Sequence, residues 1–213
     1  MAVLTRTARP ADAVRIAYLS YLAGKGHVAT SAYDLMFAGP PGPTPERIAA
    51  MAGVLTVQSV SWFHHSRYTV AEADGLAAAC LCTFPRKESR NRPLFEAFKE
   101  TGWTDDDLVA MRVRMQPFIR AELDVPNDAW VIENVGCYEQ YRRRGLTAAL
   151  LESATAKASE QGYRIIKIGV FIGNVPAISA YEKAGFAITG EKRDPSFTSV
   201  FDCPGMYQMT LEL

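Results

Sequence analysis

The sequence has no long hydrophobic run and no excess of charge of either sign. No apolar stretch approaches the roughly 20 residues that a membrane-spanning helix needs, and residues 1–6 lack the charged-then-apolar layout of a signal peptide. Lys plus Arg and Asp plus Glu number 23 each, so no global field would attract nucleic acid or anionic lipid. We therefore expect a cytoplasmic protein that has neither nucleic acid nor a membrane as a partner.

Cysteines are also few. The four cysteines are too few and too irregularly spaced for a disulfide framework. Cys80 and Cys82 flank Leu81, so a strand would place both sulfur atoms on one face. A metal pair there would need a second Cys/His pair at ligand spacing, which the sequence does not supply. We expect buried thiols that behave as small hydrophobic groups, and no metal site.

What the sequence does contain is the composition of a folded protein, with 48% hydrophobic and 22% charged residues over 213 positions. No internal repeat, low-complexity tract or linker divides it, so we expect a single domain over 1–213. Alternation, helical periodicity and turn residues predict strands at 3–7, 68–72, 76–84, 130–137, 164–171, 186–190 and 207–211. Helices are predicted after Pro10 as far as Gly24, after Pro45, at 93–100, from Thr104, at 146–161 and at 174–184.

This order predicts an α/β fold with a single mixed sheet and a helical insertion between the third and fourth strands, at about 86–128. Pro117 should kink or end the second helix of the insertion. The insertion is interpreted either as a lid or acceptor-binding element, or as a packing excursion or dimer surface.

One basic loop lies between a strand and a helix. The strand 130–137 is followed by Arg142, Arg143, Arg144, Gly145, Leu146 and Thr147, and the next helix starts there. Guanidinium groups and the free amides of a helix start both suit phosphate oxygens, although a solvated basic turn would look the same. The loop has neither the Gly-Lys-Ser/Thr of a nucleotide-binding P-loop nor the Gly-x-Gly-x-x-Gly of a dinucleotide fold.

A second segment follows some thirty residues later. Pro176 marks a helix start, and Asn174 just before it is either a helix cap or an amide that faces a ligand. Asn174, Ala177 and Tyr181 recur at helical spacing, and Gly185 ends the helix. Tyr181 could equally be an amphipathic core residue.

Together the two segments resemble the GNAT superfamily of acyl-CoA-dependent N-acetyltransferases. The family loop Arg/Gln-x-x-Gly-x-Gly/Ala is matched at Arg142–Thr147, and the family helix Asn-x-x-Ala-x-x-x-Tyr-x-x-x-Gly-Phe is matched from Asn174 to Phe186. The resemblance covers an acetyl-CoA core at about 130–186. Thr147 departs from the family's small residue and adds a β-branched side chain where the pyrophosphate would lie.

The resemblance implies that two parallel strands splay and that the pantetheine of acetyl-CoA fills the gap. Backbone groups of Val135 and Cys137 would pair with its amides. The cofactor-binding set that it implies is Val135, Cys137, Arg142, Arg143, Arg144, Gly145, Leu146, Thr147, Asn174, Ala177 and Tyr181. The family transfers the acetyl group directly to an amine, so the Cys137 side chain would be incidental.

Two proton-transfer roles follow from that chemistry. Tyr181 is the candidate acid that protonates the departing thiolate, because a phenol is a donor at neutral pH. Glu133 is the candidate base, since Glu133, Val135 and Cys137 would share a strand face if no bulge intervenes; a structural carboxylate paired with an arginine is the alternative. Lesser candidates for the base are His64, His65 and Tyr138.

The expected reaction moves an acetyl group to the primary amine of a small molecule or peptide. The alternative is a non-catalytic acyl-CoA-binding sensor or interaction module, and a homodimer is possible in either case. We expect the acceptor pocket to form from the first helices, the insertion and the loop 194–204. Trp62, Phe63, Trp103 and Phe197 hint at a partly apolar site, although all four could be core residues.

Overall fold

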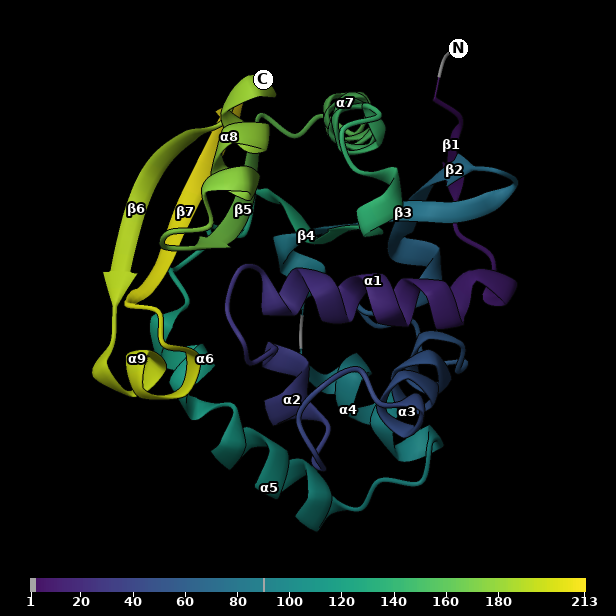
Figure 1. The fold of residues 1–213 in the computed structure, drawn as a ribbon, viewed down its shortest axis with the longest axis vertical. Helices are drawn as coiled ribbons and strands as arrows, with labels where there is room; N and C mark the ends of the chain where they lie inside the picture. Colours follow the sequence, from purple (N-terminus) through teal and green to yellow (C-terminus); the bar gives the residue numbers. More distant parts are fainter. Residues whose placement is uncertain (1–2, 90) are drawn as a thin grey trace.

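A computed structural model describes residues 3–89 and 91–213, and within these ranges the chain forms one seven-stranded sheet (Figure 1). The order is β1-β2-β3-β4-β5-β7-β6, and only β4 and β5 pair in parallel. The strands are β1 (Thr5–Thr7), β2 (Tyr68–Ala73), β3 (Leu76–Pro85), β4 (Trp130–Cys137), β5 (Ile165–Phe171), β6 (Ala187–Arg193) and β7 (Gly205–Glu212). The predicted α/β fold with a mixed sheet is therefore confirmed.

The α-helices of the described ranges cover both faces of this sheet. They are α1 (Ala13–Lys25), α2 (Ala32–Met36), α3 (Pro45–Leu55), α4 (Asn91–Glu100), α5 (Asp105–Arg114), α6 (Gln116–Ala121), α7 (Leu146–Glu160), α8 (Val175–Lys183) and α9 (Pro195–Phe201). Figure 1 shows α1 across one face of β3 and β4, with α2, α3 and α4 beyond it, and α7 on the opposite face. One apolar core lies on the α1 side of the sheet, and a second lies under α7 and α8.

Helix boundaries follow local capping signals. The Thr44 hydroxyl accepts from the Arg47 amide at 3.2 Å, and Pro45 opens α3 as predicted. The predicted stop of α1 at Gly24 is wrong, because the helix continues to Lys25 and ends at Gly26, which takes a φ of +56°. Positive φ favours glycine, so Gly26 rather than Gly24 provides the C-terminal stop.

The insertion between β3 and β4 is helical, as predicted. It contains α4, α5 and α6, and α5 begins with the Thr104 capping box in which the Asp107 amide donates to the Thr104 hydroxyl at 3.2 Å. Helix α5 ends at Arg114, and Pro117 then lies in the first turn of α6. Proline thus separates two helices here, because it can open a helix although it cannot continue one.

Two short helices were not predicted. Helix α2 begins with a capping box in which the Ser31 amide donates to Asp34 at 2.8 Å. Helix α9 lies in the segment 194–204 that we expected to be a loop, and Asp194 caps it by accepting from the Ser196 and Phe197 amides. Each helix has fewer than eight residues, too few for a periodic apolar stripe to be read from sequence.

Strand β4 contains a bulge. In its pairing with β3, Glu133 lies opposite Cys82 and Gly136 lies opposite Cys80, so two residues of β4 face one residue of β3. Within that interval Asn134 has a φ of +54°. An extra residue in one strand reverses the alternation of side chains beyond it.

The expected common face of Glu133, Val135 and Cys137 is therefore wrong. Val131 belongs to the core on the α1 side, whereas Val135 and Cys137 pack against the core under α7. Glu133, two residues after Val131 and before the bulge, points to the α1 side of the sheet. The bulge thus sends the candidate base and the candidate cofactor-binding residues to opposite sides of the strand.

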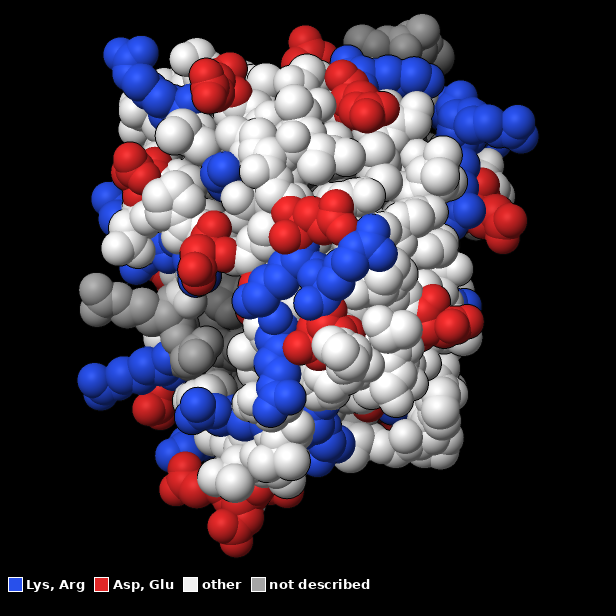
Figure 2. All heavy atoms as spheres, turned by 90° about the vertical axis from the view of Figure 1, so that its left-hand side faces the viewer, with Lys and Arg blue, Asp and Glu red and all other residues white. Residues whose placement is uncertain are grey.

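The surface carries both signs of charge. Figure 2 shows Lys and Arg side chains flanked by Asp and Glu on the face that carries β6, where Glu191, Lys192 and Arg193 are exposed. Among the described residues, no helix has both the length and the apolar composition needed to cross a membrane. In the same ranges no three His, Cys, Asp or Glu side chains gather as a metal site would require.

Candidate active site

The site lies where β4 and β5 separate. Their parallel pairing extends from Trp130 opposite Ile166 to Ile132 opposite Ile168, yet β4 continues to Cys137 and β5 to Phe171. A cavity of about 1390 Å³ opens between the diverging ends and is lined by residues of both strands. The strands thus part in the region where the resemblance placed a splay.

The basic loop forms one end of the cavity. Gly145, with a φ of +79°, precedes α7, and the first hydrogen bond of the helix runs from the Ala149 amide to the Gly145 carbonyl at 3.0 Å. Amides before Ala149 consequently have no acceptor within the helix. The predicted loop residues that line the cavity are Arg142, Arg143, Gly145, Leu146 and Thr147. Arg144 does not line the cavity, and its guanidinium lies over the Tyr141 ring at 5.2 Å.

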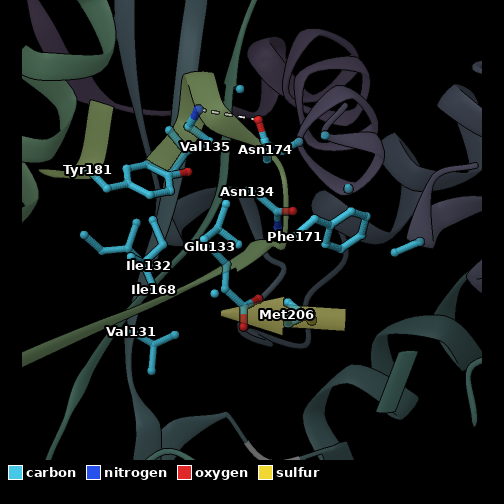
Figure 3. Close-up of a pocket in the computed structure, with 18 of the residues that line it drawn as sticks. Val131, Ile132, Glu133, Asn134, Val135, Ile168, Phe171, Asn174, Tyr181 and Met206 are labelled. Carbon is cyan, nitrogen blue, oxygen red and sulfur yellow. Dashed lines mark hydrogen bonds between the residues drawn. The ribbon is translucent and has the colours of Figure 1, made fainter. Parts of the chain in front are cut away.

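Helix α8 forms the adjoining wall. The Asn174 side chain is its N-cap and accepts from the Ala177 amide at 3.4 Å, the dashed line in Figure 3. Asn174 and Ala177 also line the cavity, so the cap and the cavity wall are the same residues. Asn174 is therefore a helix cap that also borders the cavity.

Tyr181 lines the same cavity from α8. Tyr181 is 6% exposed, and its hydroxyl makes no hydrogen bond to any residue in the described ranges. Burial raises the pKa of the Tyr181 phenol well above its ordinary value. The phenol is therefore protonated at neutral pH and available as a donor.

Glu133 reaches the cavity from the other side of β4, and Figure 3 shows its carboxylate beside Met206. The pKa of Glu133 is raised from 4.5 to about 8, chiefly by burial and to a lesser extent by the Glu122 carboxylate, while Arg86 acts in the opposite direction. No described residue lies within ion-pair or hydrogen-bond distance of the Glu133 carboxylate. The alternative of a carboxylate paired with an arginine is thus not what the geometry shows.

Val135 and Cys137 line the cavity beyond the bulge. The Cys137 thiol donates to the Tyr138 carbonyl at 3.4 Å, and burial raises the pKa of this thiol. A raised pKa disfavours the thiolate that a nucleophilic cysteine needs. The geometry therefore gives Cys137 a place in the wall of the cavity and no activated sulfur.

The lesser candidates for the base lie elsewhere. His64 is hydrogen-bonded to Ser66 at 2.8 Å and packs against His65 with ring centroids 4.2 Å apart. Tyr138 is stacked on Tyr18 at 5.4 Å. None of the three candidates lines the cavity.

The remaining cysteines are structural. Cys80 and Cys82 are fully buried in the α1-side core, as the alternation on their strand predicted. Their thiols donate to the Asn134 and Trp62 carbonyls, and burial raises the pKa of both.

The far half of the cavity is built largely by the insertion. Its lining residues there include Leu94, Phe95, Met111, Met115, Phe118, Ile119 and Glu122, together with Trp62 and Phe84. Of the four aromatic residues suggested by the sequence, Trp62 lines the cavity, whereas Phe63 and Phe197 are buried. Trp103 is half-buried and packs against the α1-side core away from this cavity. The segment 194–204 does not line it, because α9 packs against α6 instead, with the Phe118 and Phe197 ring centroids 6.2 Å apart.

Sequence reasoning missed several residues of the site. Glu122 and Tyr33 line the cavity but lie in segments with no recognisable motif, and Asn134 was passed over between two candidates. A signal for Asn134 exists, since Asn is enriched among residues that adopt positive φ. Nothing local to the sequence marks Glu122 or Tyr33.

Comparisons with known proteins agree with this geometry. The model of the Acetyltransferase (GNAT) family matches residues 46–186, more than half of the chain. No curated protein matches the sequence. The chain belongs to the GNAT family of acetyltransferases, and it is an acyltransferase of that family.

Solved structures show the same fold. A structure described as an acetyltransferase superposes with a TM-score of 0.68 at 21% identity, covering 98% of each chain. An N-acetyltransferase from Staphylococcus aureus Mu50 has a TM-score of 0.68 at 19% identity, over 98% of this chain and 100% of that one. The Drosophila melanogaster polyamine N-acetyltransferase, whose product is N-acetylagmatine, has a TM-score of 0.56 at 15% identity and covers 100% of both. Identities this low establish a common fold only.

Proposed function

We propose that the protein is an N-acetyltransferase that moves the acetyl group of acetyl-CoA to a primary amine by direct attack. One observation carries this proposal: a single cavity joins the amides of the basic loop, the Tyr181 hydroxyl and the Glu133 carboxylate through the gap between β4 and β5. An anion site, an acid and a base are the three groups that the reaction needs.

In the proposed complex, the CoA pyrophosphate lies on the amides at the start of α7, with Arg142 and Arg143 beside it. Helix-start amides and arginine side chains both bind phosphate oxygens. Pantetheine then extends along the open edge of β4 towards Val135 and Cys137. The acceptor amine enters from the insertion side, where Glu133 faces the cavity.

The chemistry follows in two proton transfers. Glu133 removes one proton from the ammonium group, and the amine lone pair attacks the thioester carbon to give a tetrahedral oxyanion. A backbone amide of β4 near the bulge stabilises that oxyanion. The C–S bond then breaks, Tyr181 protonates the thiolate, and the second amine proton returns to the Tyr181 oxygen. The products are the N-acetyl amide, CoA as the free thiol, and one proton that Glu133 releases to solvent.

A pKa of about 8 suits Glu133 to this role. A base is most effective when its pKa lies near the working pH, since it is then partly ionised and still basic enough to take a proton. An ordinary carboxylate with a pKa near 4.3 would be a much weaker base towards an ammonium group of pKa about 10.4.

The test is thiol release from acetyl-CoA with a panel of primary amines, together with calorimetric titration of CoA. We expect CoA to bind and at least one amine to give stoichiometric CoA and N-acetyl product. CoA binding without turnover on any amine of the panel would favour the sensor alternative. No binding of CoA to folded protein would remove the proposal.

A further inference from the structure

We propose that Asn134 is a positioning residue for this reaction, because its side chain locks the β4 bulge that sends Glu133 and the cofactor-facing residues to opposite sides of the strand. This inference rests on the proposed function. It assigns to Asn134 a task that is distinct from binding either substrate.

The backbone conformation of the bulge requires stabilising contacts. Asn134 has a φ of +54°, a conformation that residues other than glycine adopt at a cost and keep only when their surroundings hold them there. Asn is among the residues that tolerate it best. A tolerated conformation is still not an enforced one, so the neighbouring contacts decide.

The Asn134 side chain is held at both ends by phenols. The Tyr33 hydroxyl donates to Asn134 Oδ1 at 2.7 Å, and Asn134 Nδ2 donates to the Tyr68 hydroxyl at 2.9 Å. The Tyr68 hydroxyl is in turn 3.1 Å from the Ser20 hydroxyl. A weaker contact from the Cys80 thiol reaches the Asn134 carbonyl at 3.6 Å.

These contacts tie the bulge to three separate elements. Tyr33 comes from α2, Tyr68 from β2 and Ser20 from α1. Tyr33 is 4% exposed and Tyr68 is 1% exposed, and burial raises the pKa of both phenols well above the ordinary value. Both hydroxyl groups thus stay neutral, and the half-buried Asn134 amide would lose both of its side-chain partners in the protein if they were removed.

The consequence for the reaction is geometric. Without the extra residue, side chains of β4 would alternate regularly, and Glu133, Val135 and Cys137 would return to one face. The base would then share a side with the residues that line the pantetheine path. A displacement of about 1 Å at a reacting group can lower a rate by about a hundredfold, so a change of face would be severe and a loosened bulge would still be measurable.

Two variants test whether the Asn134 side-chain hydrogen bonds hold the bulge, one at Asn134 and one at its partner Tyr33. Asn134→Gly keeps a residue that accepts positive φ and removes the side-chain contacts. Tyr33→Phe keeps the ring and removes one hydrogen bond. The matched control is Tyr21→Phe, because the Tyr21 hydroxyl also contacts α2, donating to Asp34 Oδ2 at 3.0 Å, but does not touch Asn134.

For each variant we would measure kcat, the KM of the amine and of acetyl-CoA, and the calorimetric affinity for CoA. We expect kcat to fall at least about tenfold in Asn134→Gly and about threefold in Tyr33→Phe, with CoA affinity changed less than about twofold. Tyr21→Phe should keep the wild-type kcat. The basic loop, which binds the CoA pyrophosphate in the proposed complex, makes no hydrogen bond to Asn134. The CoA affinity therefore distinguishes a loss of Glu133 positioning from a general loss of structure.

The possible results distinguish failure of the Asn134 inference from failure of the proposed function. Wild-type kcat in Asn134→Gly, or equal losses in Tyr33→Phe and Tyr21→Phe, would overturn the inference while leaving the proposed function intact. A kcat loss that only follows a loss of CoA affinity would also overturn it. If Asn134→Gly does not fold, the difference in kcat between Tyr33→Phe and Tyr21→Phe decides the question. Failure of the wild-type protein to acetylate any amine would instead refute the proposed function itself.

Discussion

Replacement of Glu133 by glutamine should stabilise the protein at high pH while it abolishes the proposed base. The pKa of Glu133 is raised from 4.5 to about 8 by burial and by Glu122. Below pH 4.5 the folded and unfolded states both hold the proton, so this group has no net effect. As pH rises from 4.5 to 8 the unfolded chain ionises first, and the free energy of unfolding falls.

The size of the effect follows from the shift. A rise from 4.5 to about 8 corresponds to roughly 5 kcal/mol once pH exceeds 8, at about 1.4 kcal/mol per pKa unit. Water that reaches the carboxylate through the cavity screens part of this, so we expect about 2 to 3 kcal/mol. Glu133→Gln cannot ionise and should escape the penalty.

The assay is urea unfolding of the wild-type protein and Glu133→Gln at pH 5, 7 and 9. We expect the stability advantage of the variant to be small at pH 5, larger at pH 7 and greatest at pH 9. Glu122→Gln should give a smaller effect of the same sign, because the Glu122 carboxylate contributes to the raised pKa of Glu133. A difference between Glu133→Gln and wild type that does not change with pH would refute the burial argument.

Three further predictions concern the proposed acid, the basic loop and the packing of β4. Tyr181→Phe should lower kcat by about a hundredfold or more with CoA affinity nearly unchanged, measured by thiol release and calorimetry; unchanged turnover would remove the acid role. Arg143→Ala should weaken CoA binding more than Arg144→Ala, because of these two only Arg143 lines the cavity, and equal losses in a titration would contradict this. Gly136→Ala would place a Cβ 2.3 Å from the Leu19 carbonyl oxygen, so we expect urea unfolding to show a loss of about 1 to 3 kcal/mol or more. Wild-type stability in that variant would show that α1 and β4 can separate without cost.

Much of the fold was predictable because its signals are local. The Asp74-Gly75 turn between β2 and β3, the Thr44 cap of α3 and the Gly145 start of α7 each depend on a few adjacent residues. The short helices α2 and α9 were not predicted, although their caps are local. Each helix is too short for its apolar residues to show a helical period.

The candidate site was predictable in part for the same reason. Two motifs place the basic loop and α8, and most of their residues line one cavity. Arg144 shows the limit of that reasoning, since neighbouring arginines with the same local pattern point to different surroundings. The second carboxylate, Glu122, has no sequence signal, because it reaches the site only through the path of the insertion.

Local patterns in the chain specify most of the elements, their order, and which of them carry the basic loop and Tyr181. The side of β4 that the Glu133 carboxylate occupies is instead set by long-range packing. It depends on the bulge at Asn134, and the phenols that hold Asn134 lie 101 and 66 residues away in the chain. Alternation along a strand is a property of neighbours, whereas a bulge is stabilised by whatever the rest of the fold brings against it.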